Sequence, residues 1–182
     1  LIGSLFLLGL RRRRWGWERL GLRSFAPVWF LVAFGVGMVV TPLSGIIALV
    51  IRRLLALPLE SPQLSFLLPQ DINLPGGLAM IALAGLVVPL AEELFFRGLL
   101  YTWLRGRWGF APAAAVSALI FGVVHLEPSV AGTAFILGLI LAWLYERSGS
   151  LWTAVLVHAM NNSIQILLLY ALIALGFPMN GI

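Results

Sequence analysis

Residues 91–97, Ala-Glu-Glu-Leu-Phe-Phe-Arg, lie inside a long apolar run from Leu78 to Leu104. A charged side chain at the centre of a bilayer costs about 2.5–3.5 kcal/mol on translocon-based scales, so ionisable groups there are functional candidates. On a helix, Glu93 and Arg97 lie four residues apart with the acid first, which favours an ion pair. Glu92 faces a different direction. We therefore expect Arg97 to neutralise Glu93, and Glu92 to be left without a local counter-charge and free to act as a base.

The composition of the chain indicates a polytopic membrane protein. Of its 182 residues, 61% are hydrophobic and 10% are charged, whereas a soluble domain is nearer a quarter charged. The net charge of +5 comes entirely from arginine, which in a membrane protein marks cytoplasmic loops rather than nucleic-acid binding. The absence of cysteine excludes thiol catalysis, disulfides and cysteine-ligated metal. Membrane lipids are therefore expected partners, and nucleic acid is not.

The apolar segments predict an all-α, polytopic transmembrane helix bundle with five full spans plus a partial N-terminal helix. The spans are expected at Phe25–Ile51, Leu78–Leu104, Phe110–His125, Ala131–Tyr145 and Leu151–Leu175. The segment Leu54 to Gly77 contains four prolines, and we expect an interfacial or re-entrant connection rather than one continuous helix. We divide the chain into a partial helix with a basic loop, residues 1–24, and a single transmembrane domain, residues 25–182, with a catalytic core at about 78–168.

The arginines and tryptophans predict the orientation of the bundle. The loop at residues 11–24 contains six arginines. If this loop is cytoplasmic, strict alternation places the arginines after the second and fourth spans inside as well, and leaves only Arg52 and Arg53 outside. All seven tryptophans then fall at the inner side. The sequence predicts a multi-pass protein of the cell membrane with its basic loop in the cytoplasm.

The chain has only two histidines, His125 and His158, and both are expected within membrane spans. Because polar groups in lipid must find partners inside the protein, the economical arrangement turns six polar side chains toward one cavity. These six are Glu92, Glu93, Arg97, His125, His158 and Asn162. His158 and Asn162 share a helix face, as do Phe121 and His125, so Phe121 would wall the same pocket.

A carboxylate, two imidazoles and an amide are suited to hydrolysis. A glutamate can take a proton from water, and a histidine can share that water or pass the proton to a leaving amine. A second histidine and an asparagine can donate to the oxyanion of a tetrahedral intermediate, where one lost donor costs about 2.7–4 kcal/mol. The same residue types could instead hold zinc, through Glu92, His125 and His158, with an open water position.

Other proteolytic chemistries fit this sequence poorly. It contains no His-Glu-x-x-His motif, so the usual zinc helix is missing. Asp71 is its only aspartate and cannot form an aspartyl dyad. Ser148 and Ser150 precede His158 in a glycine turn, but a helix break with an N-cap explains them more simply than a nucleophile does.

Three motifs follow one another along the chain: Glu-Glu-x-x-x-Arg, Phe-x-x-x-His and His-x-x-x-Asn. Each motif alone is weak, but the three in this order on membrane helices are specific. Together they resemble the CAAX prenyl endopeptidase type II family, whose bacterial members are also called Abi or CPBP intramembrane proteases. The resemblance covers Leu78 to about Leu168.

The resemblance implies a glutamate-dependent intramembrane endopeptidase that hydrolyses a peptide or protein substrate. By its match, Glu92 with His125 would activate water. Glu93 and Arg97 would shape and support the site. The resemblance implies no cofactor, because the family mechanism is best described without a metal ligand.

By the same match, His158 and Asn162 would form the oxyanion hole. The chain has fewer complete N-terminal spans than longer family members, so the resemblance does not define the substrate entrance or its lid. Bacterial relatives include members tied to bacteriocin self-immunity or peptide maturation, so the motifs do not by themselves imply a prenylated substrate.

Two further classes of function stay open at this point. A non-catalytic membrane scaffold or immunity protein would use the polar cluster only to pack helices, and its biological activity would survive Glu92→Gln. A proton-coupled carrier would use glutamate and histidine as a relay, but the chain lacks the paired broken helices of inverted repeats. The sequence does not define the oligomeric state.

Overall fold

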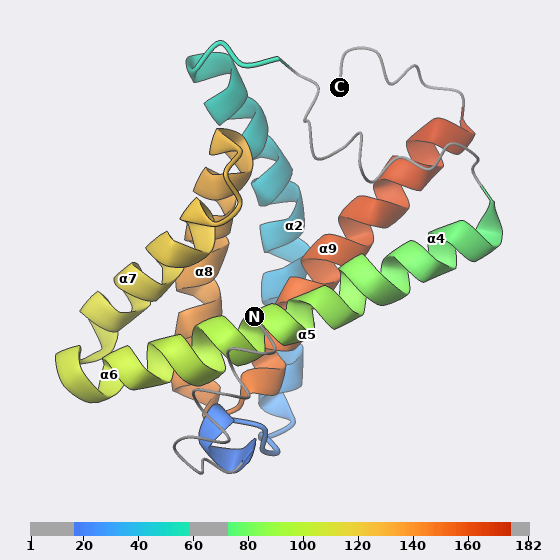
Figure 1. The fold of residues 1–182 in the computed structure, drawn as a ribbon. Helices are drawn as coiled ribbons and strands as arrows, with labels where there is room; N and C mark the ends of the chain where they lie inside the picture. The colour runs from blue at the N-terminus through green and yellow to red at the C-terminus, as the bar shows by residue number, and fades with distance from the viewer. Residues whose placement is uncertain (1–16, 59–72, 176–182) are drawn as a thin grey trace.

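The structure of the protein, a computed structural model, describes residues 17–58 and 73–175 (Figure 1). Within these residues all regular elements are helices and no strand occurs. The predicted all-α, polytopic helix bundle is thus confirmed. The expected partial N-terminal helix and most of the proline-rich connection lie outside the described residues.

A short 3₁₀ turn precedes five helical units in the described chain. One unit, Leu74–Trp108, is a single long helix that alternates between α-helical and π-helical segments. Figure 1 shows this helix, in green, crossing the front of the bundle. In chain order the elements are η2 (Trp17–Leu20), α2 (Val28–Leu54), α4 (Leu74–Met80), η3 (Ile81–Val87), α5 (Val88–Glu93), η4 (Leu94–Tyr101), α6 (Thr102–Trp108), α7 (Phe110–Val123), α8 (Pro128–Ser148) and α9 (Leu151–Ala174).

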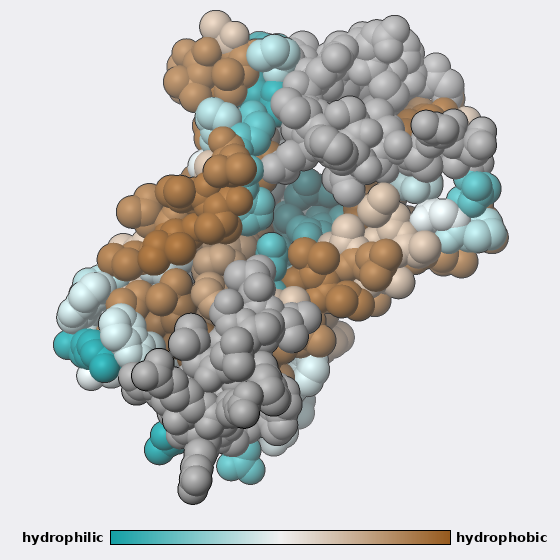
Figure 2. Space-filling view, viewed as in Figure 1, coloured by the Kyte–Doolittle hydropathy of each residue, from teal (hydrophilic) through white to brown (hydrophobic). Residues whose placement is uncertain are grey.

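Four of the five helical units are long and apolar enough to cross a membrane, and the protein is a multi-pass membrane protein. These four are α2, the Leu74–Trp108 helix, α8 and α9. The expected third span is shorter, because α7 has 14 residues and rises by about 21 Å, less than the roughly 30 Å hydrocarbon core. Large apolar side chains such as Leu31 and Val39 are exposed, as expected for contact with lipid. Figure 2 shows broad apolar areas on the outside of the molecule.

The Leu74–Trp108 helix extends beyond both predicted ends. Its start is fixed by Asn73, whose side-chain oxygen accepts a hydrogen bond from the Gly76 amide at 2.8 Å. Pro75 occupies the first turn, where a missing amide proton leaves no intrahelical bond unmade. At the other end the helix continues through two arginines to Trp108 and stops at Gly109, which adopts a φ of 80°. The apolar run therefore predicts the centre of the helix but not its two ends.

Pro89 leaves backbone carbonyls open on the side of the long helix that faces α9. It lacks the amide proton that would bond Gly85 in α-helical geometry or Ala84 in π-helical geometry. Side chains of α9 replace that donor: Asn162 Nδ2 lies 3.2 Å from the Ala84 oxygen, and Ser163 Oγ lies 3.4 Å from the Gly85 oxygen. These bonds set the register between α9 and the helix that carries the acidic pair.

One end of the bundle is closed by tight packing around Leu20, which is fully buried. The Gly21 oxygen accepts a hydrogen bond from the Leu151 amide at 2.8 Å, which joins the basic segment to the start of α9. Gly21 has a φ of +82°, and a Cβ there would meet the Tyr145 ring at 2.4 Å. Ser150 caps α9, as the sequence predicted. The starts of α2 and α9 and the ends of α6 and α8 all lie at this end (Figure 1).

Candidate active site

A cavity of about 510 Å³ lies at the opposite end of the bundle, within the size range of ligand sites. It is bounded by the second half of α2, the first half of the Leu74–Trp108 helix, the α7–α8 turn, the start of α8 and the middle of α9. Figure 2 shows polar surface deep in this hollow, between apolar outer faces. Its polar wall includes Ser44, Arg52, Glu92, His125, Ser129, Thr133, His158, Asn161, Asn162 and Gln165.

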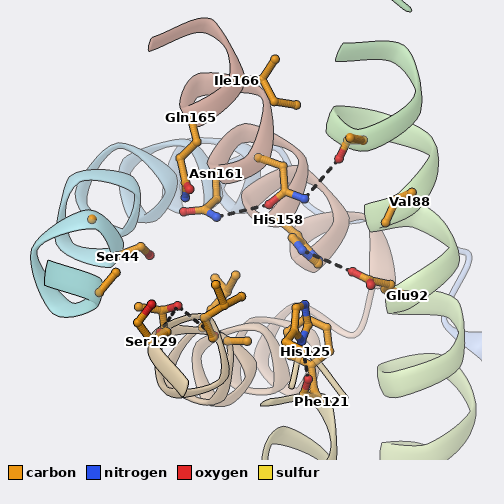
Figure 3. A pocket seen from close by; sticks show the side chains of 18 of the residues that line it. Ser44, Val88, Glu92, Phe121, His125, Ser129, His158, Asn161, Gln165 and Ile166 are labelled. Atoms are coloured by element: carbon orange, nitrogen blue, oxygen red, sulfur yellow. Dashed lines mark hydrogen bonds and ion pairs between the residues drawn. The ribbon is translucent and has the colours of Figure 1, made fainter. Parts of the chain in front are cut away.

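The structure brings four of the six predicted site residues to the wall of this cavity. They are Glu92, His125, His158 and Asn162. In Figure 3, Glu92 and His158 point toward one another, and the His125 ring points into the same space. Glu93 and Arg97 lie behind the wall, where both are fully buried.

The predicted ion pair between Glu93 and Arg97 is confirmed. Arg97 Nη1 donates to Glu93 Oε1 at 2.8 Å, and neither side chain is exposed. The guanidinium also lies 4.4 Å from the centre of the Phe121 ring, a cation–π contact worth about 2 kcal/mol when it is desolvated. Gly138 makes room for this group, because a Cβ there would lie 3.0 Å from Arg97 Nη2.

His158 connects the two glutamates. Its Nδ1 lies 2.9 Å from Glu93 Oε1, and its Nε2 lies 3.6 Å from Glu92 Oε2. The sequence predicts no local counter-charge for Glu92, whereas the structure places the His158 imidazole beside it. Since a carboxylate accepts hydrogen bonds, Glu93 favours a proton on Nδ1 of His158. Glu93 therefore orients the ring so that Nε2 faces Glu92 and the cavity.

His125 lies on the turn after α7 rather than on the helix, because α7 ends at Val123. Its Nδ1 lies 2.7 Å from the Phe121 carbonyl oxygen. A carbonyl only accepts, so Nδ1 carries the proton in this contact. His125 also lines the cavity. The Phe121 ring packs edge-on against both imidazoles, with centroid distances of 4.9 Å to His125 and 5.6 Å to His158. Both imidazoles are close enough to Glu92 to interact with its charge.

Asn162 and its neighbour Asn161 form the amide part of the wall. Asn161 Nδ2 donates to Asn162 Oδ1 at 3.3 Å, while Asn162 Nδ2 bonds the Ala84 carbonyl. Sequence reasoning missed Asn161, although the signal was present: it lies three residues after His158, and residues at i and i+3 share a helix face. The site thus presents two adjacent amides where one was expected.

Arg52 is the second functional candidate that the sequence analysis missed. It was expected to end a span on the far side of the membrane, but α2 continues to Leu54 and Arg52 is buried at the cavity wall. Its Nη2 lies 3.0 Å from Glu127 Oε1. The sequence does not distinguish Arg52 from the exposed Arg53 beside it, because only the packing of α2 against the α7–α8 turn buries one of them.

The alternative zinc site, formed by Glu92, His125 and His158, stays a prediction. Among residues 17–58 and 73–175, no group of three or more histidine, aspartate or glutamate side chains is arranged to hold a metal ion. Glu92, His125 and His158 line one cavity without forming such a group.

Residues 74–164, half of the chain, match the family described as Type II CAAX prenyl endopeptidase Rce1-like. The chain belongs to this family. The matched segment runs from the start of α4 to the two asparagines of α9, so it contains all six predicted site residues. The family resemblance seen in the three sequence motifs is confirmed.

A curated relative agrees with this assignment. The chain is 29% identical over 89 residues to the Bacillus subtilis (strain 168) protein named "Putative membrane peptidase YdiL". The alignment covers 49% of this chain and 36% of that protein, so the chain matches only about a third of the relative's length. No solved structure matches the chain.

Proposed function

We propose that the protein is an intramembrane endopeptidase that hydrolyses a peptide bond with water activated by Glu92 and the two histidines. The observation that carries the proposal is the convergence of Glu92, His125 and His158, from three separate parts of the fold, on one cavity. Membership of a family of prenyl endopeptidases supports the same reaction class.

In the proposed reaction, Glu92 and His125 activate the nucleophile. A water molecule held between the Glu92 carboxylate and His125 Nε2 attacks the carbonyl carbon of the peptide, and its proton passes to Glu92. The carbonyl oxygen becomes an oxyanion in the tetrahedral intermediate. When the C–N bond breaks, the proton held by Glu92 passes to the leaving amine, so the products are a carboxylic acid and an amine.

His158 and the two asparagines stabilise the oxyanion in this scheme. His158 Nδ1 donates to Glu93, and the Nε2 side of the ring faces the oxyanion and donates to it when it carries a proton. Asn162 uses one amide proton for the Ala84 carbonyl and has a second available, since a side-chain amide carries two donors. Asn161 supplies another amide at the same wall.

We propose that the reaction needs no metal ion. The absence of a grouped ligand set among the described residues supports this proposal. Hydrolysis should therefore persist after dialysis against a strong zinc chelator. Loss of activity that added zinc restores would replace the glutamate mechanism with a metal-assisted one.

We place the protein in the cell membrane with its basic end in the cytoplasm, following the distribution of arginine. The substrate is a peptide or protein, membrane-embedded or prenylated, that reaches the cavity through the bilayer. Proteomic comparison of membranes that contain wild-type or Glu92→Ala protein tests the proposal. We expect one or a few peptides to accumulate uncleaved in the variant, whereas identical peptide profiles would contradict proteolysis.

A non-catalytic scaffold or immunity role is the second candidate. The bonds from Asn162 and Ser163 to the long helix favour it, because they show that part of the polar cluster joins helices. In that case Glu92→Gln, which keeps the shape of the side chain, would leave the biological activity intact.

A further inference from the structure

The turn that carries His125 has a backbone conformation that requires support. Leu126 has a φ of +63°, a left-handed region that L residues adopt only at an energetic cost. The Glu127 amide donates to the His125 oxygen at 2.7 Å, which tightens the turn. Neighbouring groups must therefore hold this short segment in place if His125 is to face the cavity.

Glu127 holds the turn with its two carboxylate oxygens. Oε2 accepts hydrogen bonds from Ser129 Oγ at 2.6 Å and from the Val130 amide at 2.8 Å, and so caps the start of α8. Oε1 faces α2 and lies 3.0 Å from Arg52 Nη2. One oxygen thus fixes the turn to α8 and the other fixes it to α2.

Arg52 anchors the other side of this contact. The Arg52 and Glu127 side chains are only 8% and 11% exposed, respectively, so water screens their attraction weakly. Arg52 also donates to the carbonyl of Pro58, which holds the guanidinium at the end of α2. Arg53, the next residue on the same helix, is exposed. The chain therefore provides its own matched control for the charge of Arg52.

We propose that Arg52 and Glu127 are positioning residues that hold His125 over the cavity. Arg52 acts through Glu127 and the turn, not by contact with the reacting atoms. This proposal rests on the proposed endopeptidase function for its catalytic consequence, while the placement of the His125 ring can be measured without any substrate.

The charge state of Glu127 agrees with such a contact. Burial by itself would raise the pKa of the Glu127 carboxyl. The hydrogen bonds from Ser129 and Val130 and the charge of Arg52 outweigh burial and hold the pKa below its ordinary value. Glu127 is therefore an anion at neutral pH and attracts Arg52.

Histidine NMR tests the placement of the ring directly, because the whole chain contains only two histidines. Protein labelled at the imidazole ring and purified without a histidine tag gives two sets of ring signals, and His125→Gln assigns them. We expect Arg52→Gln and Glu127→Gln each to shift or broaden the His125 signals and to leave the His158 signals in place. Glu127→Gln keeps an oxygen that can cap α8, so it remains informative if Arg52→Gln does not fold.

Kinetics with a cleaved peptide give the second readout. Each variant should lower kcat by about tenfold or more, as expected for a displaced catalytic group, while KM changes little. Arg52→Lys should recover part of the rate, the double variant should be no slower than either single variant, and Arg53→Gln should match wild type.

The outcomes separate this proposal from the proposed function. His125 signals that are unchanged in both variants would overturn the positioning role, whatever the activity. Rate losses in the two variants that multiply in the double variant would also overturn it, because the residues would then act independently. If the wild-type protein cleaves no peptide, the endopeptidase proposal fails and the NMR result still decides how His125 is held.

Discussion

The two ends of the bundle are built from the same helices but are packed differently. At the basic end, the helices meet through fully buried apolar side chains, among them Ala33, Leu141, Leu144, Leu151 and Ala154. At the other end, α2, α8, α9 and the long helix enclose a cavity of about 510 Å³, whose wall combines apolar side chains with a cluster of polar ones. Tight packing at the closed end fixes the helices relative to one another. The same helices then hold the polar side chains in place around the cavity at the hollow end.

The comparison shows how packed helices can hold polar side chains in place inside an apolar bundle. Glu93 and Arg97 are as buried as the apolar core, yet they serve the hollow end by orienting His158. A site built on rigid helices holds its geometry more closely than a site built on loops. His125 is the exception, since it lies on a turn, and that turn has its own ion pair.

The largest expected effect is on hydrolysis in Glu92→Gln. This change keeps the size of the side chain but removes the base, so the rate should fall by about 10²–10⁴-fold. Peptide cleavage in proteoliposomes measures it, and the thermal midpoint of unfolding should stay that of wild type. Full activity in a folded Glu92→Gln protein would show that the hollow end is not a glutamate-dependent site.

The second effect is on stability in Glu93→Gln. Loss of the carboxylate leaves the fully buried Arg97 without its counter-charge, and breaking a buried ion pair in this way costs about 3–5 kcal/mol. Denaturant unfolding in detergent measures the change in the free energy of unfolding. A change well below 1 kcal/mol would mean that the buried Glu93–Arg97 pair does not stabilise the fold as proposed.

A smaller loss is expected at the closed end in Gly21→Ala. The positive φ alone costs an L residue about 1–2 kcal/mol, and the added Cβ would press on the Tyr145 ring. Unfolding should therefore occur at lower temperature, while KM and kcat of the folded fraction are kept. Altered KM or kcat with unchanged stability would contradict the division in which the closed end stabilises the fold and the hollow end carries the hydrolytic site.

The smallest effect is expected in Arg105→Gln, also at the closed end. Arg105 Nη2 lies 2.7 Å from Glu146 Oε1, but the Arg105 side chain is 43% exposed, and exposed pairs of this kind contribute little. Unfolding and hydrolysis should both match wild type within error. A clear loss of activity would extend the functional site to the closed end.

The apolar segments predicted the helix bundle. Charged side chains are costly in lipid, so the few that occur within these segments predicted the polar site. The 3.6-residue period then predicted that Glu93 would pair with Arg97. Helix ends were harder to predict. His125 lies on a turn because of the conformation of Leu126 and the cap from Glu127, and neither changes the apolar pattern of the segment.

Contacts between distant segments could not be read from the sequence. Arg52 and Arg53 are identical as sequence features, and only the approach of α2 to the α7–α8 turn buries the first. The role of Gly138 was also not predictable, because nothing in the sequence of its apolar helix shows that Arg97 packs against this position. Asn161 differs, because its i+3 relation to His158 was visible and only the i+4 position had been considered.

Hydrolysis at the hollow end requires water to reach the cavity, and cysteine accessibility tests this most directly because the chain has no cysteine of its own. Ser44 lines the cavity, whereas Val39 on the same helix is 63% exposed on the outer, lipid-facing surface. In proteoliposomes, a small charged thiol reagent should modify Ser44→Cys and leave Val39→Cys unmodified. Modification of Val39→Cys together with protection of Ser44→Cys would contradict a hydrated cavity and the hydrolytic site built on it.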